Sequence, residues 1–264
     1  MATDAGGIED GESIKLSKKK YKELMRCLSI MKILECNDVV IRHGFIREKS
    51  YNYPILTEMD LTPLIGNMSL IIPDLKNNLK DLKDFSKGKE VSISATDKLC
   101  SFSDGKTSLQ YPYPQEEDIN QEFYSEEELI SMVPINTGKL ILSTDIPKMI
   151  SKRMKVVMNK FPAYLLQVVF ENNTACISAT NASKDAYIRF MPLISINEEL
   201  NHTINLIIVS FTIDCDEKMM LEIFGTDSNI VISKLSAMVG DVKIKMYMRS
   251  FLIENELVDG KPVH

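Results

Sequence analysis

Lysine and arginine recur at helical spacing in three separate stretches of the sequence. Intervals of three or four residues place such side chains in a row along one face of an α-helix. Cations arranged in this way bind anions, and phosphate groups are their obvious partners. The three rows are Lys18, Lys22 and Arg26 with Lys19 beside them; Lys76, Lys80, Lys83 and Lys87; and Lys148, Lys152, Arg153 and Lys155.

The charge of the chain is divided unevenly. The 264 residues have a formal net charge of −6. Residues 15 to 32, 73 to 89 and 145 to 160 hold 17 Lys or Arg against 5 Asp or Glu, a balance of +12, so the rest of the chain carries −18. An acidic remainder would repel a polyanion, which argues against a protein that coats nucleic acid over its whole surface. The cationic region is therefore expected to be confined.

A single cationic helix face is ordinarily just a solvated surface. Three rows favour a function, because cations without acidic neighbours repel one another unless an anion lies opposite them. Lysine is a flexible point charge, so these rows would follow a phosphate backbone without reading base sequence. The sequence has no Trp, and its Tyr and Phe residues do not interleave with the rows, which argues against a stacking platform for single strands.

The sequence lacks a recognisable catalytic or metal-binding pattern. The three histidines, His43, His202 and His264, lie in unrelated segments and have no Cys, Asp or Glu at ligand spacing. The five cysteines are scattered and include no CxxC pair, so neither a disulfide framework nor a zinc site is expected. We therefore expect a protein that is not an enzyme, carries no metal or cofactor, and works in a reducing compartment.

Three amphipathic helices must position the cationic rows. Ser17 can cap the first helix, which would run to about Leu34. Pro73 suits the first turn of the second helix, to about residue 85, and Thr144 or Asp145 would cap the third, to about residue 160. The expected apolar sides are Tyr21, Leu24, Met25 and Leu28; Ile72, Leu75, Leu79 and Leu82; and Ile146, Met149, Ile150, Met154 and Val157.

The remaining sequence favours strands in two similar halves. From residue 89 the apolar period becomes two, with Asp104-Gly105 as a hairpin turn, which predicts an antiparallel meander. A stretch with seven acidic residues, bordered by Pro112, Pro114 and Pro134, separates the halves. We expect a disordered acidic tail over 1 to 13, domains over 14 to 112 and 138 to 254, a connector over 113 to 137 and a C-terminal tail over 255 to 264. A fourth helix near 210 to 216 would be degenerate.

No apolar run approaches the length of a membrane helix, and the acidic N-terminal residues are unlike a signal peptide. The sequence therefore predicts a cytoplasmic protein, in the host cell if it is viral, with no membrane partner.

This order of elements resembles that of the DNA sliding clamps, the ring-shaped processivity factors of replicative polymerases, and most of all the clamps of T-even-like phages. The likeness covers residues 14 to 254. It is carried by Leu16-Ser17-Lys18 and Asp74-Leu75 at the first two helices, residues 102 to 112 closing the first half, and residues 142 to 146 before the third helix.

The resemblance implies an α+β fold of two similar clamp-type domains, with antiparallel sheets on the outside and amphipathic helices packed on one face. Three identical subunits would form a ring, and the three cationic rows would contact duplex DNA inside it without sequence specificity. The implied partners are a replicative DNA polymerase and a clamp loader. The weak fourth helix is a departure from the family pattern.

The resemblance also implies a client pocket under the connector and an interface between edge strands of neighbouring subunits. Pocket candidates, each at least as compatible with ordinary core, are Ile119, Phe123, Leu129, Ile130, Met132, Phe251 and Leu252. The interface would pair Ser108, Leu109, Gln110 and Tyr111 with Ala175, Cys176, Ile177, Ser178 and Ala179 of the next chain. The alternative is a viral structural or assembly protein with the same duplicated fold and no role in DNA tethering.

Overall fold

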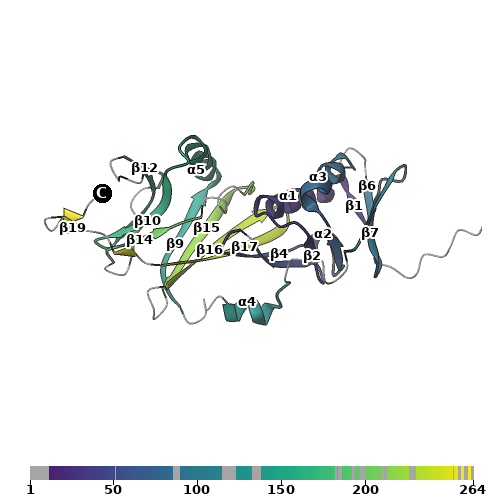
Figure 1. Cartoon of the computed structure of the whole chain (residues 1–264), viewed down its shortest axis with the longest axis horizontal. Coiled ribbons are helices and arrows are strands. Elements are labelled where there is room, and N and C mark those ends of the chain that lie inside the picture. The colour runs from purple at the N-terminus through teal and green to yellow at the C-terminus, as the bar shows by residue number, and fades with distance from the viewer. Residues whose placement is uncertain are drawn as a thin grey trace, which may run out of the picture. The chain divides into compact units, whose positions relative to one another are not determined.

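The computed structural model describes most of the chain and divides it into two compact units (Figure 1). Unit 1 comprises residues 1–53, 57–124 and 239–243, and unit 2 comprises residues 54–56, 125–238 and 244–264. The chain leaves unit 1 after Tyr124, inside the predicted connector. The described residues are 12–50, 52–85, 90–114, 123–132, 138–181, 183, 186–191, 194–196, 200–207, 210, 213–225, 230–251, 253–254, 257–258 and 261–262. No helix among them is both long and apolar enough to cross a membrane.

Unit 1 contains a four-stranded antiparallel sheet in the order β1-β6-β7-β8. Its strands are β1 (Glu12–Ser17), β6 (Glu90–Ala95), β7 (Leu99–Ser103) and β8 (Ser108–Pro112). The meander is confirmed, and Gly105 has the positive φ of 84° that the hairpin turn requires. The predicted tail over 1 to 13 was too long, because Glu12 and Ser13 pair with Ala95 and Ser94.

Two helices of unit 1 pack against each other and support the first two cationic rows. Helix α1 (Lys18–Ile33) is capped by Ser17, whose hydroxyl accepts a hydrogen bond from the Lys20 amide. Helix α3 is Leu75–Asp84. The Tyr21 hydroxyl donates to the Leu82 carbonyl at 2.6 Å, and Lys32 Nζ donates to the carbonyl of Lys76 at 2.8 Å.

The predicted start of the second helix was wrong. Ile72 ends β5 (Leu70–Ile72), which pairs with β2 (Val39–Ile41), and Asp74 has a left-handed φ of 43°. Pairing of residues 70 to 72 with β2 therefore delays the helix until Leu75. Unit 1 is completed by β3 (Phe45–Lys49), residues 57–60 of β4 (Ile55–Asp60) and the short helix α2 (Thr62–Ile65).

Unit 2 repeats the plan of unit 1. In each unit the first strand leads into a helix and later pairs with the first strand of an antiparallel meander. Strand β9 (Lys139–Pro147) pairs with β15 (Lys218–Gly225), which pairs with β16 (Ile230–Val239) and is followed by β17 (Val242–Phe251). Helix α5 is Lys148–Lys160. The predicted cap was wrong, since Thr144 and Asp145 pair with β15 and the helix begins only after Pro147.

A second sheet of unit 2 has the order β12-β11-β10-β14-β18, with β13 also paired to β11. Its strands are β10 (Leu165–Glu171), β11 (Thr174–Thr180), β12 (Tyr187–Arg189), β13 (Ile194–Ser195), β14 (His202–Asn205) and β18 (Ile253–Glu254). In the predicted C-terminal tail, β19 (Leu257–Val258) pairs with β20 (Lys261–Pro262). The expected degenerate helix falls partly outside the described residues, and residues 213 to 216 are not helical.

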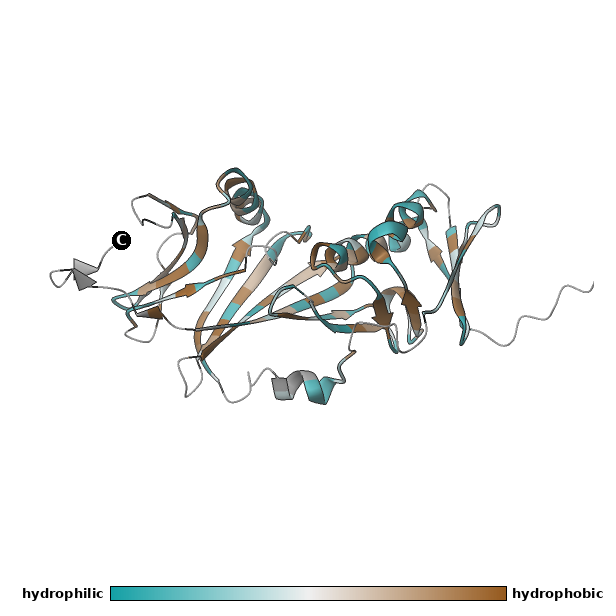
Figure 2. Cartoon of the chain, in the orientation of Figure 1, coloured by the Kyte–Doolittle hydropathy of each residue, from teal (hydrophilic) through white to brown (hydrophobic). Residues whose placement is uncertain are grey.

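Alternation of apolar and polar residues builds the core of each unit, and Figure 2 shows brown and teal segments succeeding one another along the strands. In unit 1 the inward residues Leu16, Val91, Ile93 and Phe102 are at most 1% exposed. In unit 2 Met219, Leu221 and Ile223 are fully buried on β15. Helices α1, α3 and α5 likewise bury one side and present the other to solvent.

Candidate nucleic-acid interface

Helix α1 exposes a narrow cationic strip. Half of its residues are buried, on a face wide enough to include Tyr21, Met25 and Cys27. Lys18, Lys19 and Lys22 are exposed and Arg26 is half-buried. The first row therefore lies on the part of the helix surface that does not pack against the core. Lys19 lies 3.8 Å from the buried carboxylate of Glu23, which neutralises part of this charge.

Helix α3 presents the second row on the side opposite its core. Leu75, Leu79 and Leu82 are buried, whereas Lys76, Lys80 and Lys83 are exposed. Lys87 lies outside the described residues. Asp81 and Asp84 are exposed on the same helix, so this row is mixed with acid rather than purely cationic.

Helix α5 carries the third row, but it is rotated from the orientation that the sequence predicted. Its buried residues are Ser151, Met154 and Met158, whereas Met149 is 74% exposed and Val156 is 65% exposed. Lys152, Arg153 and Lys155 are exposed. Lys148 is held by an ion pair to Asp214 at 3.5 Å, so it is less available for a ligand than its position in the row suggested.

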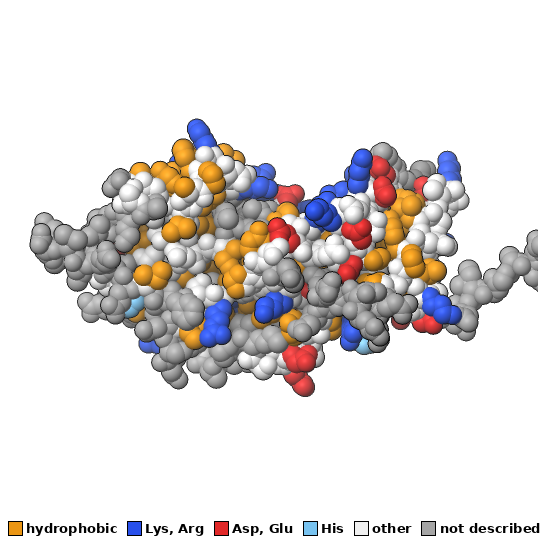
Figure 3. Space-filling model, in the orientation of Figure 1, with side chains coloured by type: hydrophobic (Ala, Val, Ile, Leu, Met, Phe, Trp, Pro, Cys, Tyr) orange, Lys and Arg blue, Asp and Glu red, His pale blue; other side chains and the backbone are white. Residues whose placement is uncertain are grey.

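Most cations of the three rows lack an ion-pair partner among the described residues. Within the part of the chain that the structure describes, eight of them make no ion pair: Lys18, Lys22, Lys76, Lys80, Lys83, Lys152, Arg153 and Lys155. Figure 3 shows blue Lys and Arg side chains standing over α5 and over α1 and α3. Flexible, exposed ammonium groups of this kind suit phosphate backbones.

The two strands predicted to join neighbouring chains differ in availability. Among the described strands, β8 is the outermost of its sheet, so one side of Ser108 to Tyr111 pairs with no described strand. The prediction for Ala175 to Ala179 was wrong, because β11 pairs with β10 on one side and with β12 and β13 on the other. The Ile177 carbonyl accepts from the Phe190 amide as well. Among the described strands, β12 is an outer strand of this sheet beside β11, and its short sequence gave no signal of this edge position.

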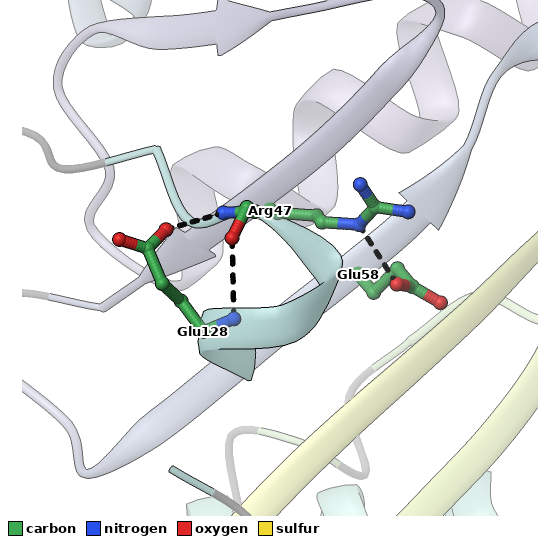
Figure 4. A network of polar contacts seen from close by, with 4 residues as sticks. Arg47, Glu58 and Glu128 are labelled. Atoms are coloured by element: carbon green, nitrogen blue, oxygen red, sulfur yellow. Dashed lines mark hydrogen bonds and ion pairs between the residues drawn. The ribbon is translucent and has the colours of Figure 1, made fainter. Parts of the chain in front are cut away.

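The connector is described only in part. Phe123 is half-buried, and its ring lies 5.2 Å from the guanidinium carbon of Arg42. Helix α4 (Glu126–Met132) begins with a capping box, since the Glu128 amide donates to the Ser125 hydroxyl and the Ser125 amide donates to the Glu128 carboxylate (Figure 4). Ile119, Leu252 and the side chains of Leu129, Ile130, Met132 and Phe251 lie outside the described residues.

Among the described residues, no group of three or more His, Cys, Asp or Glu side chains is placed to hold a metal ion. The described cysteines are all buried, and burial raises the pKa of the Cys100 thiol to about 12. Such a thiol remains protonated at neutral pH and is a poor nucleophile.

No family model and no curated protein matches the sequence. Solved structures do match the fold. The PCNA2-PCNA3 complex of Sulfolobus tokodaii aligns with a TM-score of 0.61 and 9% identity, over 90% of this chain and 99% of that one. The DNA polymerase sliding clamp of Caulobacter crescentus aligns with a TM-score of 0.57 and 10% identity, over 94% of this chain and 68% of that one. The chain has the sliding-clamp fold.

A third structure, the PCNA of A. fulgidus bound to the C-terminal region of FEN-1, aligns with a TM-score of 0.58 and 13% identity over 92% of this chain and 99% of that one. The near-complete coverage of the PCNA chains means that the sliding-clamp fold accounts for both units. The expectation of two similar domains with antiparallel sheets and helices is thereby confirmed.

Proposed function

We propose that this protein is a DNA sliding clamp, a non-enzymatic ring that encircles duplex DNA without sequence specificity and tethers the replicative polymerase. The observation that carries the proposal is the row of unpaired cations on each of α1, α3 and α5, in a chain whose net charge is −6. In the sliding-clamp fold, such rows are suited to a phosphate backbone and an acidic remainder would keep DNA off the other surfaces.

We further propose that the protein is a homotrimer and that a clamp loader places it on DNA in the cytoplasm. We also propose that it is a clamp of the T-even-like phage type. The support is the length and order of elements in the sequence. Client binding near the connector stays a prediction, to which the A. fulgidus PCNA bound to a segment of FEN-1 gives a precedent.

DNA topology provides the direct test of encirclement. The protein is first loaded on nicked circular DNA, either with a polymerase accessory extract or by using a high protein concentration. It is then expected to stay bound at a salt concentration that removes proteins bound only to the DNA surface. Cutting the circle should then release it within minutes, whereas blocking both ends of the linear product should prevent release. Retention on linear DNA with free ends would contradict encirclement and favour an ordinary surface binder.

The proposed subunit contact joins β8 of one chain to β12 of the next. Each of these strands has a side that pairs with no described strand, and unpaired edges readily accept another strand. Leu165 and Tyr187 lie on either side of Thr180 in the register of the sheet, and they are 48% and 46% exposed. Directly paired residues share a face of the sheet, so these two apolar side chains form a patch beside the β12 edge that a second copy would cover.

Replacing Leu165 and Tyr187 together by aspartate is expected to convert the oligomer into monomers. Light scattering over a concentration series should give about three times the 29.9 kDa chain mass for the unmodified protein and the chain mass itself for the variant. Met238→Asp is the matched control, because Met238 is 44% exposed but lies on β16, between two other strands. An undiminished mass for the double variant would overturn this contact.

A further inference from the structure

Two acidic side chains of unit 1 are buried close together. Glu48 on β3 is fully buried, and Asp38 just before β2 is 7% exposed. Glu48 Oε1 accepts a hydrogen bond from the Val40 amide at 2.6 Å, and Asp38 Oδ1 accepts one from the Asp74 amide at 2.8 Å. Burial raises the pKa of Glu48 to about 8, and the neighbouring Asp38 charge adds to this effect, while hydrogen bonds from Val40 and Cys36 oppose it.

The backbone of Glu48 also holds the end of the connector. Glu48 and Phe123 form an antiparallel bridge, and the Tyr124 amide donates to the Arg47 carbonyl at 3.0 Å. Tyr124 is 7% exposed, and Arg42 lies over the ring of Phe123. Glu48 therefore places a buried carboxyl group in unit 1 with its side chain, and pairs with the connector end through its backbone.

We propose that a proton on Glu48 fastens the connector end to β3, and that loss of this proton to solvent releases Phe123 and Tyr124. An ionised Glu48 beside Asp38 must gain water, because two buried carboxylates in one site are not both stable as anions. Water reaches the side chain only if β3 opens locally, and that opening breaks the bridge. The inference does not depend on the proposed function.

The other charged groups around Glu48 are already engaged. Arg47 Nε donates to Glu58 Oε2 at 2.9 Å (Figure 4), and the Arg47 guanidinium lies over the Phe45 ring. Arg42 contacts Phe123, and the Asp38 carboxylate binds the amide before α3. Within the part of the chain that the structure describes, the Cys36 thiol is an uncharged titratable neighbour of Glu48 and donates a hydrogen bond to it.

The sign of the effect follows from the raised pKa. Between the ordinary value of 4.5 and about 8, the folded protein holds a proton that the unfolded chain has lost. Stability contributed by the neutral acid is therefore lost as pH rises through this range, and the unfolding equilibrium constant increases by up to tenfold per pH unit. Glu48→Gln keeps the acceptor for Val40 without a titrating proton, so its stability should not fall in this way.

A tryptophan reporter tests release of the connector end. The chain has no Trp, so Phe123→Trp provides a single indole next to Arg42. In the full chain with Glu48, we expect the indole emission to shift to the red reversibly, with a midpoint near pH 8. The shift should be lost when Glu48→Gln is added and kept when Glu58→Gln is added instead. A shift that persists with Gln at position 48, or no shift with Glu there, overturns the proposal.

Amide exchange checks the result without the reporter. The unmodified chain and Glu48→Gln are compared at the same pH, so the chemical dependence of exchange on pH cancels. Above pH 8 the peptide that contains Phe123 and Tyr124 should exchange at least tenfold faster in the unmodified chain, and at neutral pH the two should agree within twofold. Equal exchange at both pH values would contradict the proposal even if Phe123→Trp had disturbed the fold.

Discussion

Replacing Lys76, Lys80, Lys152 and Lys155 by glutamate is expected to abolish retention of the protein on circular duplex DNA. These side chains are exposed, and within the described residues none has an ion-pair partner, so reversal should neither disrupt packing nor leave a buried charge. Each lost phosphate contact should reduce the slope of log binding constant against log salt concentration by about 0.9. Four charge reversals should weaken binding by about 10³-fold or more at low salt. Retention on nicked circles and its salt dependence are the measurements.

The control set for this experiment is Lys49→Glu, Lys98→Glu, Lys106→Glu and Lys243→Glu. These four lysines are also exposed and change the net charge by the same amount, but none lies on α1, α3 or α5. Retention should survive in the control set, and light scattering should give an unchanged mass for both sets. Equal loss in both would mean that total charge, rather than the three rows, governs binding, and unchanged retention of the first set would remove the rows from the interface.

The largest effect on stability is expected from Gly44→Ala. Gly44 has a φ of 79°, its amide donates to the Met68 carbonyl, and its carbonyl accepts from the Leu61 amide. A β-carbon there would overlap the carbonyl of Gly66 and lie 2.7 Å from Thr62 Cγ2. Because backbone rather than a flexible side chain stands in the way, we expect a loss of about 3 kcal/mol or more of unfolding free energy.

Gly105→Ala separates the cost of the backbone angle from that of the overlap. Gly105 has a similar φ of 84°, but a β-carbon there meets no atom within 4 Å. Its replacement should cost about 1 kcal/mol. Chemical denaturation of the two variants measures both values, and a Gly44→Ala protein no less stable than Gly105→Ala would show that the turn relaxes around the new methyl group.

Local sequence signals predicted the elements that depend on local chemistry. Ser17 marks the start of α1 because capping is an interaction between near neighbours. Asp104-Gly105 marks the turn between β7 and β8 for the same reason. Strand β1 escaped prediction, since its six residues, Glu12 to Ser17, alternate weakly and are fixed by pairing with β6, more than 70 residues later. The start of α5 was misplaced because pairing of β9 with β15 outweighs the capping preference of Thr144.

The candidate site shows the same division. The exposed rows on α1 and α3 follow from helical spacing, because residues three or four positions apart lie on the same face of a helix. The rotation of α5 does not follow, since Met149 and Val156 are apolar and yet exposed. Nor does the ion pair of Lys148 with Asp214, because these two residues are distant in the sequence. The enclosure of β11 does not follow either, because the residues of a strand do not show which strands pair with it. Edge strands are a property of the finished sheet.

Strands β8 and β12 are different surfaces of the chain, which limits the symmetry that they can generate. A contact between two unlike surfaces is heterologous, so it cannot close as a two-fold dimer and leaves one free edge at each end of any open assembly. Such a series ends only when the rotation from one copy to the next divides a full circle, and it otherwise continues as a filament. In an assembly built on the proposed β8–β12 contact, the number of copies is therefore governed by an angle rather than by affinity, and a substitution that tilts this contact would alter the number without weakening the contact.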